Sequence, residues 1–295
     1  MKPLKLLLLG LLALPVLAEP LPPINEPATT EAHPGKFIWA DLFTSDQTAA
    51  TTFYIGLFHW TATTIERQPK TNPQPYVVLS HNGRPIAGIG LYPRQLPAQA
   101  HGRWVGYVSV ADAPAALTAA TAAGGHVLFP ARNLVKRGIQ AIFIDPQGGM
   151  LGLLRSSTGD PGDYRPEAGD WAWAQHFARD PAAAALFYHT VLGYEVLPDE
   201  RTNRPNTFLF SSGGFARASL APLPNRPNAK PGWLLFVRVA NIQESAELAA
   251  TLGGRILVAP KQVDQGTQLA IVADAVGAAI GLVELAEPAE TQEQP

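Results

Sequence analysis

The chain has 295 residues, of which 46% are hydrophobic and 8% aromatic, and its formal net charge is −2. This length and apolar content suit two ordinary folded domains and exclude a largely disordered protein. The small net charge, without any run of Lys or Arg, argues against nucleic acid as a partner. The chain has no cysteine, which excludes disulfides, zinc-thiolate sites and a cysteine nucleophile.

Residues 1–18 have the features of a signal peptide. Lys2 and Lys5 precede an apolar run from Leu6 to Leu17, and Ala18 offers a small side chain for cleavage. The run is shorter than the roughly 20 residues that span a bilayer, so we expect no membrane span after cleavage. These features predict a secreted or periplasmic protein, and an uncleaved N-terminal anchor is the alternative.

Composition divides the rest of the chain into two similar parts. Residues 19–36 are rich in Pro, Glu and Thr and predict a disordered linker. A first module then covers residues 37–156, and a Pro/Gly/Asp-rich linker follows at 157–168. A second module covers residues 169–286, before a polar tail at 287–295 that we expect to be disordered.

The first half of each module predicts a strand, a helix and a β-hairpin. Residues 37–43 are apolar without helical spacing, and Asp46 is placed to cap a helix after them. Asp180-Pro181 marks the same start in module 2, since proline is favoured at the first helical position. Apolar runs on both sides of Asn82-Gly83 and Gly213-Gly214 predict the two hairpins.

The second half of each module repeats this order. Strands that begin near Trp104 and Trp233 lead to helices capped by Asp112 and Asn241. Glycine pairs end both helices, because glycine readily takes the left-handed conformation that terminates a helix. Further strands follow around residues 145 and 274.

The two modules are therefore duplicates. Trp39 and Trp173 lie 134 residues apart (173 minus 39), and Asp145 and Asp274 lie 129 apart (274 minus 145). A repeat of this length indicates duplicated domains rather than a solenoid. The predicted fold class is α+β, with each module built of two βαβββ units that form curled mixed sheets.

The motifs in these elements resemble the vicinal oxygen chelate superfamily, which contains glyoxalases, bleomycin-resistance proteins and extradiol dioxygenases. They are a strand followed by an Asp-capped helix with Phe-Tyr, a Gly-Gly helix end, and Asp-Pro-Gln-Gly at residues 145–148. The nearest branch is the two-module glyoxalase-like one. The resemblance covers almost the whole chain after the signal peptide and implies the fold far more specifically than the reaction.

The resemblance also implies where metal ligands would stand. In metal-dependent members a His or Gln precedes the first Asp, a His lies on the matching strand of the second unit, and a Glu follows the Asp-Pro motif. The corresponding positions in this chain are Trp39, Trp173, Val105, Leu234, Gly152 and Gly281. None of these carries a metal-donor side chain, and the seven histidines lack helix- or strand-borne ligand spacing. We therefore predict no metal and no cofactor.

Alternation along the strands places candidate ligand-binding side chains on the concave faces. The candidates are Trp39, Asp41, Tyr107, Trp173, Gln175, Arg217, Phe236 and Arg238. The tryptophans would either line a cavity or fill a core. Arg238 lies on an apolar strand and needs an anionic partner, which Asp41, another internal carboxylate or an anionic ligand would supply.

No catalytic residue emerges, since the chain has no G-x-S-x-G and no Ser/His/Asp set whose proximity the sequence supports. We predict an exported, metal-independent protein that binds a small, partly apolar or aromatic molecule in a Trp-lined cavity, with turnover left open. The alternatives are a metal-dependent lyase or dioxygenase with displaced ligands, and a non-catalytic interaction scaffold. A homodimer is also compatible with the sequence.

Overall fold

The computed structural model describes residues 21–65, 75–91, 102–202, 204–226, 229–264 and 266–286. The predicted signal peptide and the tail at residues 287–295 lie outside the described residues. Across the described ranges, none of the helices is both long and apolar enough to cross a membrane.

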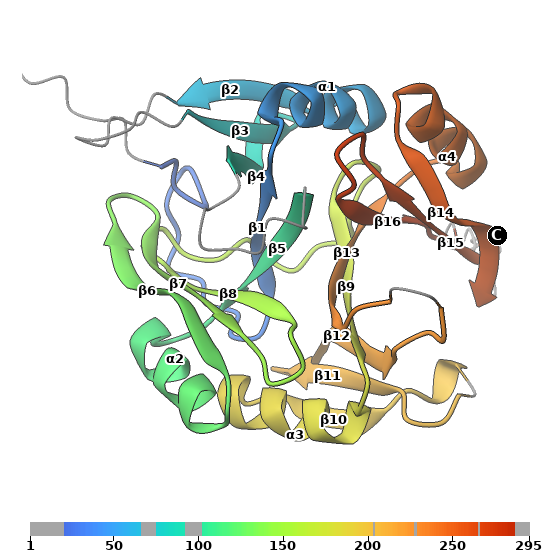
Figure 1. Ribbon diagram of the computed structural model, residues 1–295. Helices are drawn as coiled ribbons and strands as arrows, with labels where there is room; N and C mark the ends of the chain where they lie inside the picture. Colours follow the sequence, from blue (N-terminus) through green and yellow to red (C-terminus); the bar gives the residue numbers. More distant parts are fainter. Residues whose placement is uncertain are drawn as a thin grey trace, which may run out of the picture.

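Each module forms one eight-stranded mixed sheet (Figure 1). In module 1 the strand order is β2-β3-β4-β1-β5-β8-β7-β6, and in module 2 it is β10-β11-β12-β9-β13-β16-β15-β14. The module 1 strands are β1 (Phe37–Thr44), β2 (Thr61–Ile65), β3 (Tyr76–His81), β4 (Arg84–Leu91), β5 (Gly102–Ser109), β6 (His126–Leu134), β7 (Gly138–Ile144) and β8 (Met150–Ser156). The module 2 strands are β9 (Trp171–Ala178), β10 (Glu195–Pro198), β11 (Phe208–Ser212), β12 (Phe215–Pro222), β13 (Gly232–Arg238), β14 (Arg255–Asp264), β15 (Thr267–Ala273) and β16 (Ala279–Glu284).

The four helices begin where the sequence predicts. They are α1 (Gln47–Phe58), α2 (Ala113–Ala122), α3 (Pro181–Leu192) and α4 (Ile242–Thr251), and a 3₁₀ turn, η1, covers Glu200–Thr202. The side chains of Asp46, Asp112, Asp180 and Asn241 each accept a hydrogen bond from a backbone N–H of the first turn. These bonds satisfy donors that a helix start leaves unpaired. The predicted fold class, an α+β duplication of two βαβββ units per module, is thus confirmed.

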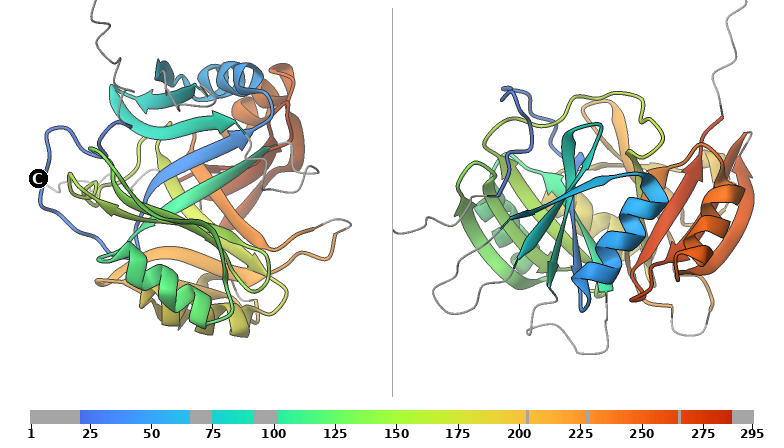
Figure 2. Two further views of the ribbon diagram at one scale, coloured as in Figure 1. Left: turned by 60° about the vertical axis from the view of Figure 1, so that its left-hand side comes forward. Right: turned by 90° about the horizontal axis from the view of Figure 1, so that it is seen from above.

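The two modules share one hydrophobic core between their helix-covered faces. Figure 1 shows α1 beside α4 on one side of the molecule and α2 beside α3 on the opposite side, and the left view of Figure 2 shows the same pairing. Aromatic rings meet across the junction: Trp171 lies 5.3 Å from Trp104, and Phe143 lies 5.8 Å from Phe187. The strands bury one side here, which leaves their other sides, free of helices, for a site.

Reciprocal hydrogen bonds also join the modules. Tyr188 of α3 donates to Asp145 of module 1 at 2.6 Å, and Tyr54 of α1 donates to Asp274 of module 2 at 3.1 Å. Asp145 also pairs with His176, at 2.9 Å. His176 is fully buried and faces the helices, as strand alternation predicts. These aspartates, like the aromatic rings, hold the junction between modules.

The two segments predicted as linkers take defined courses. Residues 21–36, here named the N-terminal strap, bury Leu21 and Ile24 against module 1, which differs from the disordered linker that their Pro-rich composition predicts. The inter-module linker, residues 157–168, is also tied down, because its Asp163 pairs with Lys36 at 2.9 Å and with Arg217 at 2.6 Å. Few but well-placed apolar and charged side chains order both segments.

Candidate functional site

Each sheet has a helix-free face, and the two faces differ. The helix-free face of module 1 carries Trp39, Asp41 and Tyr107, and its apolar side chains form a cluster separate from the shared core. The helix-free face of module 2 carries Trp173, Gln175 and Phe236, among a second separate cluster. Six of the eight predicted site residues therefore lie in these two groups of three.

In module 1 the three predicted residues meet around a buried carboxylate. Asp41 Oδ1 accepts a hydrogen bond from Trp39 Nε1 at 2.8 Å and one from Tyr76 Oη at 2.6 Å. Tyr107 is the cross-strand partner of Trp39 and accepts a hydrogen bond from Gln140 Nε2 at 3.0 Å. The Trp39 indole N–H is thus already used within the protein.

The hydroxyl groups of Tyr76 and Tyr107 can act as hydrogen-bond donors and not as bases. Burial raises the pKa of Tyr76, and the Asp41 carboxylate beside it raises it further, while Arg137 opposes the rise. Burial and Asp41 likewise raise the pKa of Tyr107 well above its usual value. Both hydroxyls therefore stay protonated over the whole working pH range and can donate hydrogen bonds to Asp41 or to a ligand.

The helix-free face of module 1 is covered. Trp39 is only 2% exposed and Tyr107 is fully buried. Leu21 and Ile24 of the N-terminal strap pack into the same cluster, and Arg137 lies over the Trp39 ring at 3.8 Å. A ligand on this face would lie beneath the strap.

The helix-free face of module 2 is open by comparison. Trp173, Gln175, Phe177, Leu269 and Ile271 are all only partly buried, and Phe236 lies at their base. Trp173 Nε1 donates to Ser219 Oγ at 2.9 Å, which fixes the ring. The Arg201 guanidinium lies over this ring at 5.8 Å, and Trp173 remains partly exposed. The side-chain amide of Gln175 makes no hydrogen bond to the described part of the chain. This face offers flat apolar surface with a few hydrogen-bonding groups, the usual composition of a small-molecule site.

The two predicted arginines are directed to the inter-module linker. Both terminal nitrogens of Arg217 bind the carboxylate of Asp163, at 2.6 and 3.1 Å. Hydrogen bonds from Arg217 and Lys36 outweigh the effect of burial and lower the pKa of Asp163 to about 2. Arg238 Nη1 donates to the backbone carbonyl of Pro166 at 2.7 Å. The structure therefore gives both side chains partners in the linker.

Several residues at these faces were not among the sequence candidates. Tyr76, Arg137 and Gln140 join the module 1 group. In module 2, Ser219 binds the Trp173 indole N–H and Arg201 lies over the Trp173 ring. Arg137 lies in the basic turn Val-Lys-Arg-Gly between β6 and β7, which has the composition of an exposed turn. Tyr76 could have been placed on this face only from the two-residue alternation of β3, because it lies two residues before Val78, which packs in the same cluster.

The residues present do not fit the divalent metal that the resemblance implies. Gly152 and Gly281 occupy the positions of the expected carboxylate ligand, and aromatic rings fill the space beside them. A Cβ atom on Gly152 would lie 2.1 Å from Tyr107 Cδ1, and one on Gly281 would lie 2.1 Å from Phe236 Cδ1. Within the described ranges, no three His, Cys, Asp or Glu side chains come together as a metal-binding group. The described residues at both faces therefore lack the donor set for such an ion.

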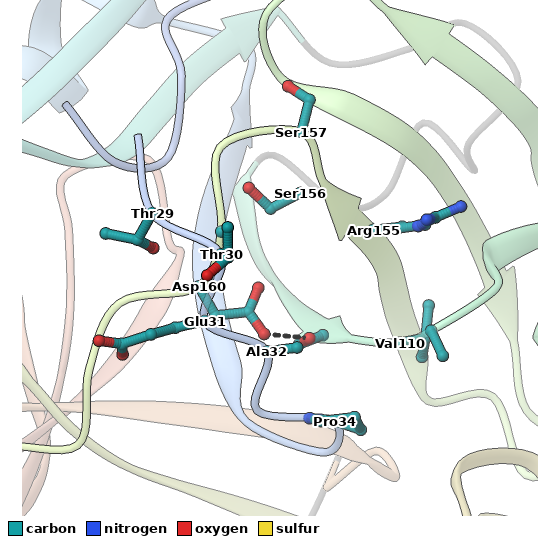
Figure 3. Close-up of a pocket in the computed structure, with 13 residues that line it drawn as sticks. Thr29, Thr30, Glu31, Ala32, Pro34, Val110, Arg155, Ser156, Ser157 and Asp160 are labelled. Atoms are coloured by element: carbon teal, nitrogen blue, oxygen red, sulfur yellow. Dashed lines mark hydrogen bonds between the residues drawn. The ribbon is translucent and has the colours of Figure 1, made fainter. Parts of the chain in front are cut away.

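A separate hollow of about 340 Å³ lies where the N-terminal strap crosses the end of β8 (Figure 3). Thr29, Glu31, Arg155 and Asp160 are among the residues that line it. The Asp160 carboxylate accepts a bond from Ser109 Oγ at 2.5 Å, drawn in Figure 3, and one from the backbone N–H of His33 at 2.6 Å. The Asp160 carboxylate thus holds the strap in place and is already used within the protein. We therefore place the candidate site on the helix-free faces and not in this hollow.

Comparison with known families covers both modules. Residues 36–153 match the model of the Glyoxalase/Bleomycin resistance protein/Dioxygenase superfamily, and residues 173–283 match that of the Glyoxalase-like domain. The chain belongs to the vicinal oxygen chelate superfamily. Its two modules are glyoxalase-like, as the motifs predict.

Relatives in this superfamily align over nearly their whole length. The provisionally named glyoxylase CFP32 of Mycobacterium tuberculosis is 27% identical over 265 residues, covering 88% of this chain and 98% of that protein. The anthracycline biosynthesis protein DnrV of Streptomyces peucetius is 26% identical over 269 residues, covering 88% and 96%. Both therefore share the two-module arrangement of this chain.

Solved structures show the same superfamily fold at much lower identity. The Mn(II)-bound glyoxalase of Novosphingobium aromaticivorans superposes with a TM-score of 0.57 at 13% identity, covering 87% of this chain and 84% of that one. The 2,3-dioxygenase LapB of Pseudomonas sp. KL28 gives 0.57 at 12% identity, covering 90% and 96%. At such identity the likeness concerns the fold alone.

Proposed function

We propose that this superfamily member binds a small, partly apolar or aromatic molecule on the helix-free face of module 2, without a metal ion. The observation that carries the proposal is the contrast between the two related tryptophans. Trp39 is 2% exposed and covered, whereas Trp173 is partly exposed beside Phe236, Leu269 and Ile271. A flat apolar wall with a hydrogen-bonding amide beside it suits a planar ligand.

The names of two relatives point the same way. DauV of Streptomyces sp. (strain C5) and DnrV are both named as anthracycline biosynthesis proteins. Anthracyclines contain a flat fused-ring system, and a ligand of this shape would stack on Trp173. Gln175 would orient the ligand by hydrogen bonding, because its side-chain amide makes no hydrogen bond to the described residues.

Metal independence is supported by the residues at the ligand positions. Glycine cannot coordinate an ion, and Tyr107 and Phe236 fill the space that a longer side chain would need. Elemental analysis of the purified protein, after reconstitution with Mn²⁺, Fe²⁺ and Zn²⁺, should give far less than one metal per chain. One tightly bound equivalent would overturn this part of the proposal.

Binding is tested by thermal-shift and fluorescence titration with planar aromatic compounds, including an anthracycline. A ligand that binds only the native state raises the melting temperature. Trp173→Leu should weaken binding at least tenfold while keeping an apolar side chain at this position. The control is Leu186→Ala, on the exposed side of α3, which should bind as the wild type does. No shift with any compound, or equal affinity in Trp173→Leu, would contradict the proposal.

We also propose export, because the N-terminal sequence carries the signal features described above. The test is N-terminal sequencing of the protein recovered from the periplasm or the medium of expressing bacteria. Cleavage after Ala18 gives Glu19 as the first residue. An intact Met1 in the cytoplasmic fraction would contradict export.

A further inference from the structure

Arg137 is a charged residue that is completely buried. It lies in the turn between β6 and β7, and its side chain is 0% exposed. Its guanidinium lies 3.8 Å from the centre of the Trp39 ring, and its Nε donates to the Pro22 carbonyl at 2.7 Å. The side chain is thus held in place by a cation–π contact and one hydrogen bond.

Among the residues that the structure describes, none accepts a hydrogen bond from the outer part of this guanidinium. Nη1 and Nη2 of Arg137 are buried, and neither has a hydrogen-bond acceptor in the part of the chain that the structure describes. Gln140 Oε1, on β7, is also buried and has no donor among the described residues. Burying charged donors without an acceptor costs far more than leaving them in water. This local arrangement is explained if another molecule supplies the acceptor.

Asp41 does not fill this role. Its Oδ1 already accepts bonds from Trp39 and Tyr76, and the ion pairs found among the described residues do not include one between Asp41 and Arg137. Both charges nevertheless act on Tyr76 and Tyr107, so they lie in the same neighbourhood. The surroundings of the guanidinium therefore already contain one carboxylate.

We propose that module 1 contains a binding site for a small carboxylate, which Arg137 holds through Nη1 and Nη2. The planar guanidinium fork matches two coplanar carboxylate oxygens. A singly charged carboxylate fits better than a doubly charged phosphate, because Asp41 already adds one negative charge to the surroundings. This site is distinct from the aromatic site proposed on module 2.

The N-terminal strap closes the site. Leu21 and Ile24 cover the same face, and the backbone N–H groups of Ile24 and Asn25 donate to Thr158 Oγ1 at 3.2 and 3.1 Å. Because the Pro22 carbonyl binds the same guanidinium as the ligand would, a bound carboxylate holds both Arg137 and the strap in place. Occupancy should therefore slow the hydrogen exchange of the strap amides.

The site is tested on the chain that begins at Glu19 and runs to Pro295. Acetate is the probe and acetamide its neutral counterpart, at constant ionic strength. Acetate should raise the melting temperature in a saturable way and protect the amides of Ile24 and Asn25 from exchange. Acetamide should do neither, and inorganic phosphate should bind more weakly than acetate. Equal effects of acetate and acetamide, or phosphate binding at least as tightly as acetate, would overturn the proposal.

Two variants at Arg137 keep the test decisive. Arg137→Met retains a long unbranched side chain without charge and should lose the acetate response, and Arg137→Lys should bind acetate at least tenfold more weakly. Arg155→Gln, at an exposed position, should respond as the wild type does. An acetate response retained by both Arg137 variants would refute the assignment. So would a crystal structure grown in acetate in which only water contacts Nη1 and Nη2.

Discussion

Gly152 and Gly281 lie directly beside aromatic rings on the neighbouring strands. Each is the parallel cross-strand partner of an aromatic residue, Tyr107 and Phe236 respectively. The resemblance to the superfamily implies that these glycines stand where metal-dependent members carry a ligating side chain. The structure adds that a side chain at either position would require the neighbouring ring to move, because the ring occupies the space that the new Cβ atom would need.

We expect Gly152→Ala to lower the free energy of unfolding by about 1–3 kcal/mol, because the new methyl group overlaps the buried Tyr107 ring. The control is Gly90→Ala, where the nearest atom to the new Cβ is 3.7 Å away on Phe43. That change should leave stability within about 0.5 kcal/mol or increase it slightly. Urea unfolding of both variants checks the difference, and equal stabilities would show that Tyr107 moves aside freely.

The sequence predicts a site residue when neighbouring residues of the same strand fix its position. It does not predict one whose position depends on a distant segment. Trp39 and Asp41 follow from the two-residue alternation of a single strand, and the structure joins them by a hydrogen bond. Arg137 could not be predicted, because its burial depends on the N-terminal strap more than 100 residues earlier in the chain. The linker partners of Arg217 and Arg238 were missed for the same reason.

At the scale of elements, α1 and α3 are equivalent helices of the two modules, but different residue types follow them. The residue after α1 is His59 and the one after α3 is Gly193, and both take the left-handed conformation, with φ of 56° and 68°. The backbone N–H of this residue still donates to a carbonyl of the last turn, Ile55 in α1 and His189 in α3, and the left-handed conformation then turns the chain out of the helix. It is costly for a residue with a Cβ and nearly free for glycine.

We therefore expect His59→Gly to stabilise the protein by about 0.5–1 kcal/mol, because the left-handed strain is removed. The matched exchange, Gly193→His, should destabilise it by a similar amount. Thermal and urea unfolding of the two variants measure both effects. A loss of stability in His59→Gly would mean that the imidazole contributes something other than strain.

Helix starts and hairpin turns were predictable because their signals are local. A capping Asp or Asn acts on the three residues that follow it, and Asn82-Gly83 turns its own hairpin with φ of 49° and 74°. The short edge strands β2 and β10 carry no such signal. Their sequences, TATTI and EVLP, lie largely exposed, so neither has the alternation of buried and exposed residues that identifies a strand.

At the scale of the whole molecule, Asp163 ties three distant segments together. It lies in the inter-module linker and pairs with Lys36 before module 1 and Arg217 in module 2. Its pKa of about 2 reflects these two cations, whose hydrogen bonds outweigh the burial that would raise it. A lowered carboxylate pKa means that the native state favours the ionised form.

The stability from Asp163 should be complete above its unfolded pKa of about 4 and should be lost as the pH falls towards 2. Asp163→Asn should therefore be less stable than the wild type at pH 7, with the difference shrinking between pH 4 and pH 2. Urea unfolding at pH 7, 4, 3 and 2.5 measures this trend. Glu31→Gln, at an exposed carboxylate of the strap, should keep the wild-type pH dependence, and a difference that does not shrink for Asp163→Asn would contradict the pairing.

The reciprocal bonds from Tyr54 to Asp274 and from Tyr188 to Asp145 have the pattern of a twofold symmetric dimer, in which each half gives and receives the same contact. Here both halves belong to one polypeptide, so the interface forms within a molecule and its assembly does not depend on protein concentration. A true dimer of identical subunits must carry the same residues on both of its faces. A tandem chain has no such constraint, and its halves can specialise: one face is sealed over an arginine and the other stays open around a tryptophan.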